Sequence, residues 1–251
     1  MKRFDVTITD NDASALSIVA IHGIQGTRSS WDPVVKLLQN DARWIQPNLR
    51  GRAHAFRGSQ VSDYILEKFA ADIAEVIATH VTTPNFVLAG WSMGVSVTLA
   101  TIALLQRENL PLPAALILMS GSPVLKQTTW FQQTDYEPLL QEIEAREVRL
   151  GLREAADRDA VAWTWQAIHH TDQRPLLPAI EIPTLIVHGS DDEDSPLAHA
   201  HLLAHDLPNT SLRIIDGGKH SILTQNTVRV ADEMRSFLST IATHGVTHAN
   251  Q

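Results

Sequence analysis

Cysteine is absent from this chain of 251 residues. Disulfides, thiolate nucleophiles and cysteine-bound metal centres are therefore excluded. No stretch approaches 18 uninterrupted apolar residues, the length that predicts a transmembrane helix. The first ten residues, MKRFDVTITD, contain two basic side chains but lack the apolar core of a signal peptide. We expect a cytoplasmic protein with no membrane partner.

Positive charge is also scarce. The chain has 20 Lys and Arg residues against 28 Asp and Glu, a formal net charge of −8, and the basic residues are scattered. A nucleic-acid surface needs a basic patch or stripe, so no nucleic-acid partner is expected. The length and the 44% hydrophobic content fit one well-buried domain, or one domain with a modest insertion.

Short apolar runs alternate along the chain with longer stretches of helical periodicity. The runs predict strands at residues 15–23, 43–49, 85–90, 114–122, 183–190 and 211–218, of which 15–23, 114–122 and 183–190 read as buried and 43–49 is weaker. Among the helices between them, Ser62 is the expected N-cap of one, and Ser195 followed by Pro196 begins another. This alternation predicts an α/β fold, a doubly wound and mostly parallel sheet with helices on both faces.

One interval breaks the alternation. About sixty residues lie between the strand ending near Ser120 and the strand starting near Thr184, whereas a crossover needs about a dozen. Apolar positions recur there at helical spacing, so we predict a lid of two or three helices at residues 123–178. Residues 1–122 and 179–251 then form the core.

Residues 90–94 read GWSMG and lie where a predicted strand meets a predicted helix. In an α/β sheet the ligand crevice lies beyond the carboxyl ends of the strands. A tight strand-to-helix turn holds its central residue in an uncommon backbone geometry and needs neighbours without bulk two positions away. We predict that Ser92 is a nucleophile, with a simple helix cap as the alternative.

A serine nucleophile needs a general base, and the base needs an orienting acid. Of the 12 histidines, three stand at the ends of predicted strands, namely His22, His188 and His220. His220 follows the last strand in the turn DGGKHS, whose glycines let the chain bend over the sheet edge. It is the predicted base.

The acid is expected in the segment HGSDDEDSP, residues 188–196. Four neighbouring carboxylates repel one another and cannot all be oriented for catalysis. We interpret Asp194 and Ser195 as helix-start residues. Asp191 and Asp192 remain, and spacing alone does not choose between them.

The chain order of serine, aspartate and histidine, each at a strand end, resembles the α/β-hydrolase family. HGIQGTRSSW (residues 22–31) is similar to the family's His-Gly loop. PNLRGRA (residues 47–53) is similar to its proline–aspartate–leucine–arginine–glycine segment, with altered positions. GWSMG and GGKHS resemble its nucleophile turn and histidine loop, and its acid loop, glycine-x-x-aspartate with a proline four beyond, points to Asp192. The resemblance covers nearly the whole chain.

This resemblance implies a serine hydrolase with an acyl-enzyme intermediate. Ser92 would attack the acyl carbon, His220 would transfer the proton, and Asp192 would orient His220. The backbone N–H groups of Ile24 and Met93 would form the oxyanion hole. Such chemistry requires neither a cofactor nor a metal. His22 would only shape its loop.

A serine in the nucleophile turn argues against dehalogenases and epoxide hydrolases, whose relatives use aspartate there. The lid is similar in placement to that of carboxylesterases, which predicts small-molecule esters of small or medium acyl groups as substrates. Thioesterases, lactonases, perhydrolysing esterases and carrier-protein methyl ester esterases are alternatives, as is a hydrolase-fold ligand receptor with little turnover. Five aromatic residues either line an apolar substrate pocket or pack the lid: Trp91, Trp130, Phe131, Trp163 and Trp165.

Charged residues in the lid have two interpretations. Arg146, Arg149, Arg153 and Arg158 are interleaved with four glutamates, which is typical of a solvated helix with i,i+4 ion pairs. The alternative is a docking face for an acidic acyl-carrier protein. The oligomeric state and the natural substrate are not predicted.

Overall fold

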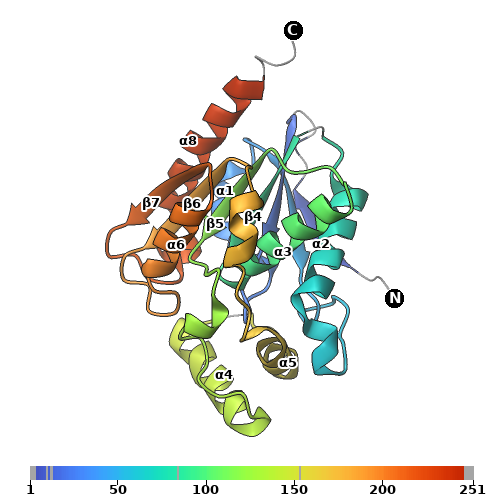
Figure 1. The fold of residues 1–251 in the computed structure, drawn as a ribbon, viewed down its shortest axis with the longest axis vertical. Helices are drawn as coiled ribbons and strands as arrows, with labels where there is room; N and C mark the ends of the chain where they lie inside the picture. The colour runs from blue at the N-terminus through green and yellow to red at the C-terminus, as the bar shows by residue number, and fades with distance from the viewer. Residues whose placement is uncertain (1–3, 10, 12–13, 84, 153, 246–251) are drawn as a thin grey trace.

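The computed structural model describes residues 4–9, 11, 14–83, 85–152 and 154–245 (Figure 1). Seven strands form one sheet in the order β1-β3-β2-β4-β5-β6-β7. Only β1 (Asp5–Thr9) is antiparallel to its neighbour, β3 (Arg43–Asn48). The parallel strands that follow are β2 (Leu16–Ile21), β4 (Asn85–Trp91), β5 (Ala115–Met119), β6 (Thr184–Gly189) and β7 (Thr210–Ile215). The predicted mostly parallel sheet is confirmed, and β1 is an additional edge strand.

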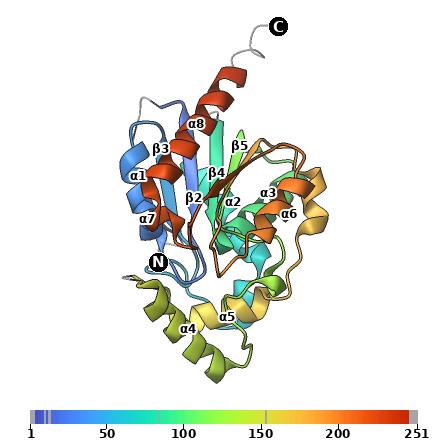
Figure 2. The same ribbon diagram turned by 90° about the vertical axis from the view of Figure 1, so that its left-hand side faces the viewer.

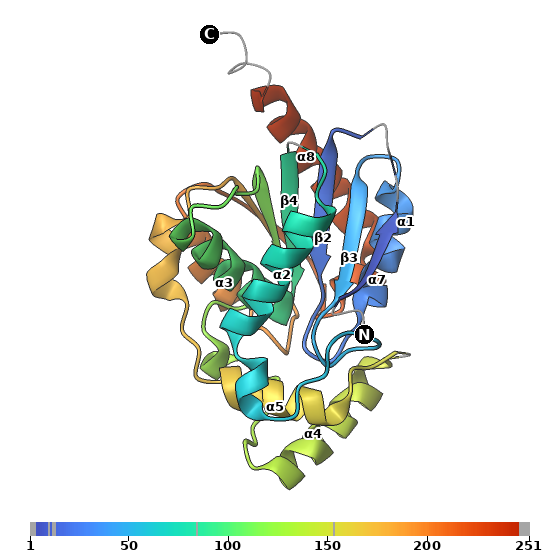
Figure 3. The same cartoon turned by 90° about the vertical axis from the view of Figure 1, so that its right-hand side faces the viewer.

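Helices cover both faces of the sheet (Figures 2 and 3). One face carries α1 (Asp32–Leu38), α7 (Ile222–Gln225) and α8 (Thr227–Gly245), and the other carries α2 (Leu66–His80), α3 (Met93–Arg107) and α6 (Ala198–Asp206). Along β2, Ile18 and Ala20 pack on the first face while Val19 and Ile21 pack on the second. Burial on both faces explains why these strands read as continuous apolar runs.

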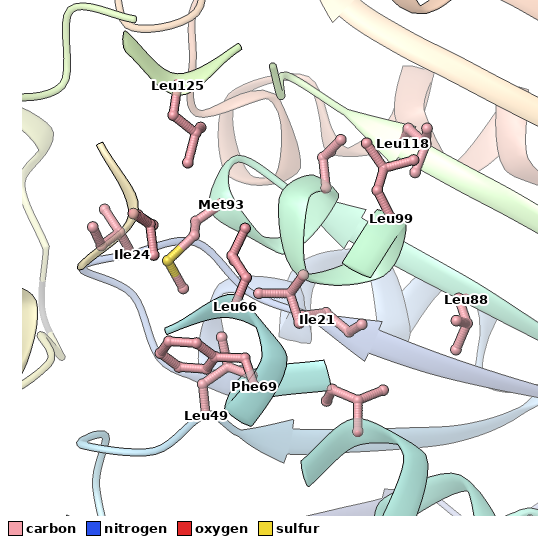
Figure 4. Packing of buried hydrophobic residues seen from close by; sticks show 14 of the residues in the cluster. Ile21, Ile24, Leu49, Leu66, Phe69, Leu88, Met93, Leu99, Leu118 and Leu125 are labelled. Carbon is pink, nitrogen blue, oxygen red and sulfur yellow. The ribbon is translucent and has the colours of Figure 1, made fainter. Parts of the chain in front are cut away.

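The second face also anchors the residues beside the nucleophile turn. The side chains of Ile24 and Met93 are buried in the same apolar cluster as Leu66 and Phe69 (Figure 4). Because these side chains are packed in the core, they help to hold the adjoining backbone peptides in place.

An insertion lies between β5 and β6. It contains α4 (Tyr136–Leu150) and α5 (Arg158–Ile168), flanked by the 3-10 helices η3 (Leu125–Gln127) and η4 (Arg174–Ala179). In Figures 1 and 3, α4 and α5 lie side by side beyond one end of the sheet. The Gln25 side chain, in the loop after β2, donates to the carbonyl of Ile143 in α4 at 2.9 Å. The insertion therefore contacts the carboxyl end of the sheet.

Two predicted helix starts are wrong. Ser62 falls in the 3-10 helix η2 (Val61–Tyr64), and Ile65 is extended with ψ 153°, so α2 begins only at Leu66. A further 3-10 helix, η1 (Arg28–Trp31), likewise precedes α1. Ser195 lies before α6, which begins at Ala198, because the Ser195 N–H is held in a separate loop by the carboxylate of Asp192.

Candidate active site

Ser92 occupies the turn between β4 and α3 with φ 59° and ψ −123°, and its N–H donates to the carbonyl of Met119 at 2.9 Å. The two glycines of the turn are needed for space. A Cβ on Gly90 would lie 2.4 Å from the carbonyl oxygen of Gly94, and a Cβ on Gly94 would lie 2.2 Å from that of Ile21. Backbone thus packs directly against backbone around the serine.

The structure brings Ser92, His220 and Asp192 together. The Ser92 Oγ lies 2.9 Å from His220 Nε2, although 128 positions separate the two residues. On the other side of the ring, Nδ1 lies 3.0 Å from both carboxylate oxygens of Asp192. The three residues are only 2%, 3% and 5% exposed, in the same order. A proton on Nδ1 leaves Nε2 as the acceptor facing the serine hydroxyl.

The Asp192 carboxylate is also held by backbone donors. Its Oδ1 accepts the N–H of Asp194 at 3.0 Å and that of Ser195 at 2.8 Å. Burial alone would raise the pKa of Asp192, but the facing His220 ring and the Ser195 N–H lower that pKa below its usual value. The neighbouring Asp191 instead accepts the hydroxyl of Ser190 at the surface. The structure thus places Asp192, and not Asp191, against the histidine.

His22 serves the loop after β2. Its Nδ1 donates to the carbonyl of Gly23 at 2.8 Å and its Nε2 accepts the N–H of Leu49 at 3.0 Å. Complete burial and the neighbouring Arg52 lower the pKa of His22 to about 3, so the ring is neutral. The buried Arg52 guanidinium also donates to the carbonyl of Ile24. These contacts fix the peptide of Ile24.

Ile24 lies in the loop after β2, and Met93 directly follows Ser92 at the start of α3. Gly23 brings the first loop close, since a Cβ there would lie 3.0 Å from the Ser92 Cβ. Within the described part of the chain, neither the N–H of Ile24 nor that of Met93 donates a hydrogen bond to a protein acceptor.

A family model described as "Alpha/beta hydrolase family" matches residues 18–233. The chain belongs to the alpha/beta hydrolase family. It is 28% identical to a Synechocystis sp. protein named as a putative non-heme chloroperoxidase, over 88% of this chain and 90% of that protein. It is 40% identical to the mouse serine hydrolase BPHL, but over only 24% of this chain and 19% of the mouse protein.

Solved structures share the fold of this family member. A lipase-esterase related protein from Clostridium acetobutylicum superposes with a TM-score of 0.78 at 17% identity, covering 94% of this chain and 99% of that one. An esterase from Exiguobacterium antarcticum superposes with a TM-score of 0.77 at 20% identity, covering 94% and 96%. At such identities the likeness concerns the fold.

Aromatic residues of this hydrolase-family chain lie in two places. Trp91 packs on the face that carries α1, α7 and α8, where its Nε1 donates to the carbonyl of His220 at 3.0 Å. Trp130 and Phe131 pack against Trp165 in the other cluster, with ring centroids 5.9 and 5.6 Å away. Trp163 is packed against the same cluster, and its ring centroid lies 5.8 Å from that of Tyr64. The five candidate pocket residues are thus not in one group, and Trp91 instead supports the histidine loop.

A cavity of about 170 Å³ adjoins His220. Its walls are mostly charged or polar: Arg149, Leu150, Asp191, Glu193, Asp194, Lys219, His220, Ser221 and Gln225. No candidate pocket aromatic lines this cavity.

A metal-binding group and a membrane-spanning helix are both absent from the residues that the structure describes. Their His, Asp and Glu side chains form no group of three or more that could hold a metal ion. None of their helices has the length and apolar character needed to cross a membrane.

Sequence reasoning missed a buried ionic network under α4. Arg146 is 5% exposed and pairs with Asp194 at 3.1 Å, so the predicted solvated i,i+4 pair is wrong at this position. Asp194 is accordingly a partner of the insertion and not a helix-start residue. The buried positions Leu139 and Ile143 precede Arg146 by seven and three residues, a spacing that places it on the inner helix face. That spacing was the available signal.

Arg149 and Arg158 of the insertion are nearer to the surface. Arg158 pairs with Glu144 and Glu147 at 3.0 and 2.9 Å, and Arg149 pairs with Asp194 at 2.7 Å. Arg153 lies outside the described residues.

Proposed function

We propose that this chain is a serine carboxylesterase that cleaves small-molecule esters of small or medium acyl groups. The observation that carries the proposal is the contact of 2.9 Å between the Ser92 Oγ and the His220 Nε2, with Asp192 behind the ring. A serine hydroxyl is a weak nucleophile near neutral pH, and this arrangement supplies both the base and the group that orients it.

The reaction follows from these contacts. As Ser92 Oγ attacks the acyl carbon, His220 Nε2 accepts the hydroxyl proton and Asp192 stabilises the imidazolium. The N–H groups of Met93 and Ile24 bind the developing oxyanion, and loss of one such donor costs about 3 kcal/mol of transition-state stabilisation. His220 then protonates the leaving alcohol. It next accepts a proton from the water that attacks the acyl-enzyme, and returns this proton to the Ser92 Oγ as the carboxylic acid leaves.

Residues 123–178 act in this proposal as a lid over a core formed by residues 1–122 and 179–251. The burial of Ser92 and His220, which are only 2% and 3% exposed, supports this role of the insertion. The acyl group would lie against aromatic side chains of the insertion, namely Trp130, Phe131, Trp163 and Trp165. A substrate then reaches the serine only after the insertion moves.

Turnover of p-nitrophenyl esters with acyl chains of increasing length tests the function. We expect multiple turnovers by the wild type, and a loss of at least about 10⁴-fold in kcat for Ser92→Ala. Hydrolysis that persists in this variant would overturn the proposal. A single slow event with retained product would indicate a ligand receptor.

The name of the Synechocystis relative favours perhydrolysis as a second candidate. Hydrogen peroxide in place of water would attack the Ser92 acyl-enzyme and release a peroxycarboxylic acid, which can oxidise halide ions in solution. The rates of peracid formation and of ester hydrolysis, measured at matched acyl-donor concentration, distinguish the two candidates. The Ser92→Ala variant should lose both activities.

A further inference from the structure

Helix α4 places a charged side chain in the protein interior. Arg146 donates from Nη1 to Gln25 Oε1 at 2.6 Å and from Nη2 to Asp194 Oδ2 at 3.1 Å. Its guanidinium also lies 5.6 Å from the ring centroid of Phe131. Burial of a guanidinium is unfavourable unless its donors are bound, so these two acceptors determine where the side chain lies.

The first acceptor, Gln25, belongs to the loop after β2, residues 22–28. This segment is named the oxyanion loop because it contains Ile24. Gln25 directly follows Ile24 and is 2% exposed. Its Nε2 donates to the carbonyl of Ile143, which turns Oε1 toward Arg146, and its backbone carbonyl accepts the N–H of Ala156 at 2.9 Å. Three contacts thus tie the residue next to Ile24 to the insertion.

The second acceptor belongs to the acid loop. Asp194 accepts from Arg146 and Arg149 through its side chain, and its N–H donates to Asp192 Oδ1 at 3.0 Å. Its carbonyl accepts the N–H of Thr129, at the start of the insertion, at 3.1 Å. A displacement of Asp194 would therefore move a donor that holds the Asp192 carboxylate.

We propose that Arg146 is a positioning residue that fixes the oxyanion loop relative to the acid loop when the insertion is in place. This inference rests on the proposed hydrolase function. By binding Gln25 and Asp194 together, Arg146 sets the Ile24 N–H at the correct distance from the Ser92–His220 pair. It touches neither the substrate nor the reacting atoms.

Steady-state kinetics of Arg146→Met test the proposal, because methionine keeps an apolar stem but removes every donor. A misplacement of about 1 Å at a catalytic group lowers the rate about 100-fold. We expect kcat to fall between about 10-fold and 100-fold, with KM within about threefold of the wild type. Gln25→Ala should behave in the same way. Arg146→Lys should recover only part of the loss, since one ammonium cannot reach both acceptors.

Two matched variants serve as controls. Arg149→Met removes a cation that also binds Asp194 but does not contact Gln25, and Arg158→Met removes one that pairs within the insertion. Both should keep kcat within about twofold to threefold of the wild type, because the bridge remains. Equal losses in the Arg146 and Arg158 variants would mean a general effect of charge removal and would overturn the proposal.

Amide hydrogen exchange gives a readout that needs no turnover. Exchange in residues 22–28 and 190–196 should accelerate in Arg146→Met and stay unchanged in Arg158→Met.

Unchanged kcat, or a raised KM alone, would overturn the positioning role. If Arg146→Met does not fold, the kcat and KM of Arg146→Lys and Gln25→Ala test the positioning role in its place. A wild type without Ser92-dependent turnover would defeat the proposed function, and the exchange pattern would still support or refute the bridge between the two loops.

Discussion

Residue 92 has a backbone conformation that favours glycine, with φ 59° and ψ −123°. For a residue with a side chain, such a conformation costs about 1–3 kcal/mol. The hydrogen bond to Met119 and the close backbone packing hold Ser92 there. Strain at this position is therefore tied to presenting the hydroxyl to His220.

Ser92→Gly should release this strain. The released strain is partly offset by the larger entropy that glycine loses on folding. We therefore expect the free energy of unfolding to rise by about 1 kcal/mol, while hydrolysis is lost. Denaturant unfolding compared with Ser92→Ala, which keeps a Cβ, measures the effect. A glycine variant less stable than the alanine variant would contradict this explanation.

Asp192→Asn should lower kcat by about 10⁴-fold while the fold is retained, because an amide can hold the wrong tautomer of His220. Steady-state hydrolysis measures the change. Asp191→Asn is the matched control, since the side chain of that neighbour accepts from Ser190 and lies at the surface. Equal losses of kcat in the two variants would show that the negative charge of the segment matters, and not the contact between Asp192 and His220.

His22 predicts a pH dependence of stability. Its pKa is lowered from 6.5 to about 3 on folding, so between these values the unfolded chain binds one more proton than the folded chain. Stability must then rise with pH in this window and fall on acidification, by up to about 1.4 kcal/mol per pH unit.

Replacing His22 with asparagine should remove this contribution. We expect the slope of unfolding free energy against pH, measured from about pH 4 to about pH 6, to decrease by about 1.4 kcal/mol per unit. The variant's lower stability at neutral pH does not affect the comparison of slopes. An unchanged slope would mean that His22 is not buried in the neutral form.

At the scale of elements, the junction of β4 and α3 tolerates no added atom at Gly94. A Cβ there would lie 2.2 Å from the carbonyl oxygen of Ile21, in strand β2, which is paired on both sides by β3 and β4. Gly94→Ala should therefore lower the free energy of unfolding by about 3 kcal/mol or more. Chemical denaturation measures this value.

Gly151→Ala is the control for that experiment. Gly151 ends α4 with φ +60°, and a Cβ added to it would meet no atom within 4 Å. Only the cost of a left-handed alanine, about 1 kcal/mol, is therefore expected. A Gly94→Ala variant as stable as Gly151→Ala would show that the turn can adjust.

The elements differ in how far the sequence predicts them. Buried strands were predicted because burial on both faces gives continuous apolar runs, and Ser92 because it follows such a run. His220 was predicted because it stands in a glycine-containing turn after the last strand. β1 was missed because an edge strand with intermediate burial carries little apolar signal. The start of α2 was missed because a 3-10 turn ending at Tyr64 uses the residues that would otherwise cap the helix.

Long-range contacts explain what could not be predicted in the site. The choice between Asp191 and Asp192 depends on the direction in which each side chain leaves its loop, and only the family resemblance indicated it. The spacing of Leu139, Ile143 and Arg146 could indicate that Arg146 is buried, but its partner Gln25 is 121 residues away. No local pattern reports such a partner.

At the scale of the molecule, one apolar cluster joins the insertion to the sheet. It includes Leu139 and Trp165 of the insertion together with Leu88 and Leu118 of the central strands. Because insertion and core share this cluster, we expect them to unfold in one cooperative transition.

Trp165→Ala tests this cooperativity. Loss of a large buried side chain should lower the free energy of unfolding by about 3–5 kcal/mol. The midpoints seen by tryptophan fluorescence and by far-ultraviolet circular dichroism should fall together. Two separate transitions would show that the insertion is an independent unit.

Covalent labelling measures whether His220 activates the hydroxyl of Ser92. A p-nitrophenyl alkylphosphonate should add one phosphonyl group to the wild type, located by peptide mass spectrometry at Ser92. The rate should fall by at least about 10³-fold in His220→Ala, because the base that activates the hydroxyl is gone. Labelling at another residue, or a rate that does not depend on His220, would mean that Ser92 and His220 do not act as nucleophile and base.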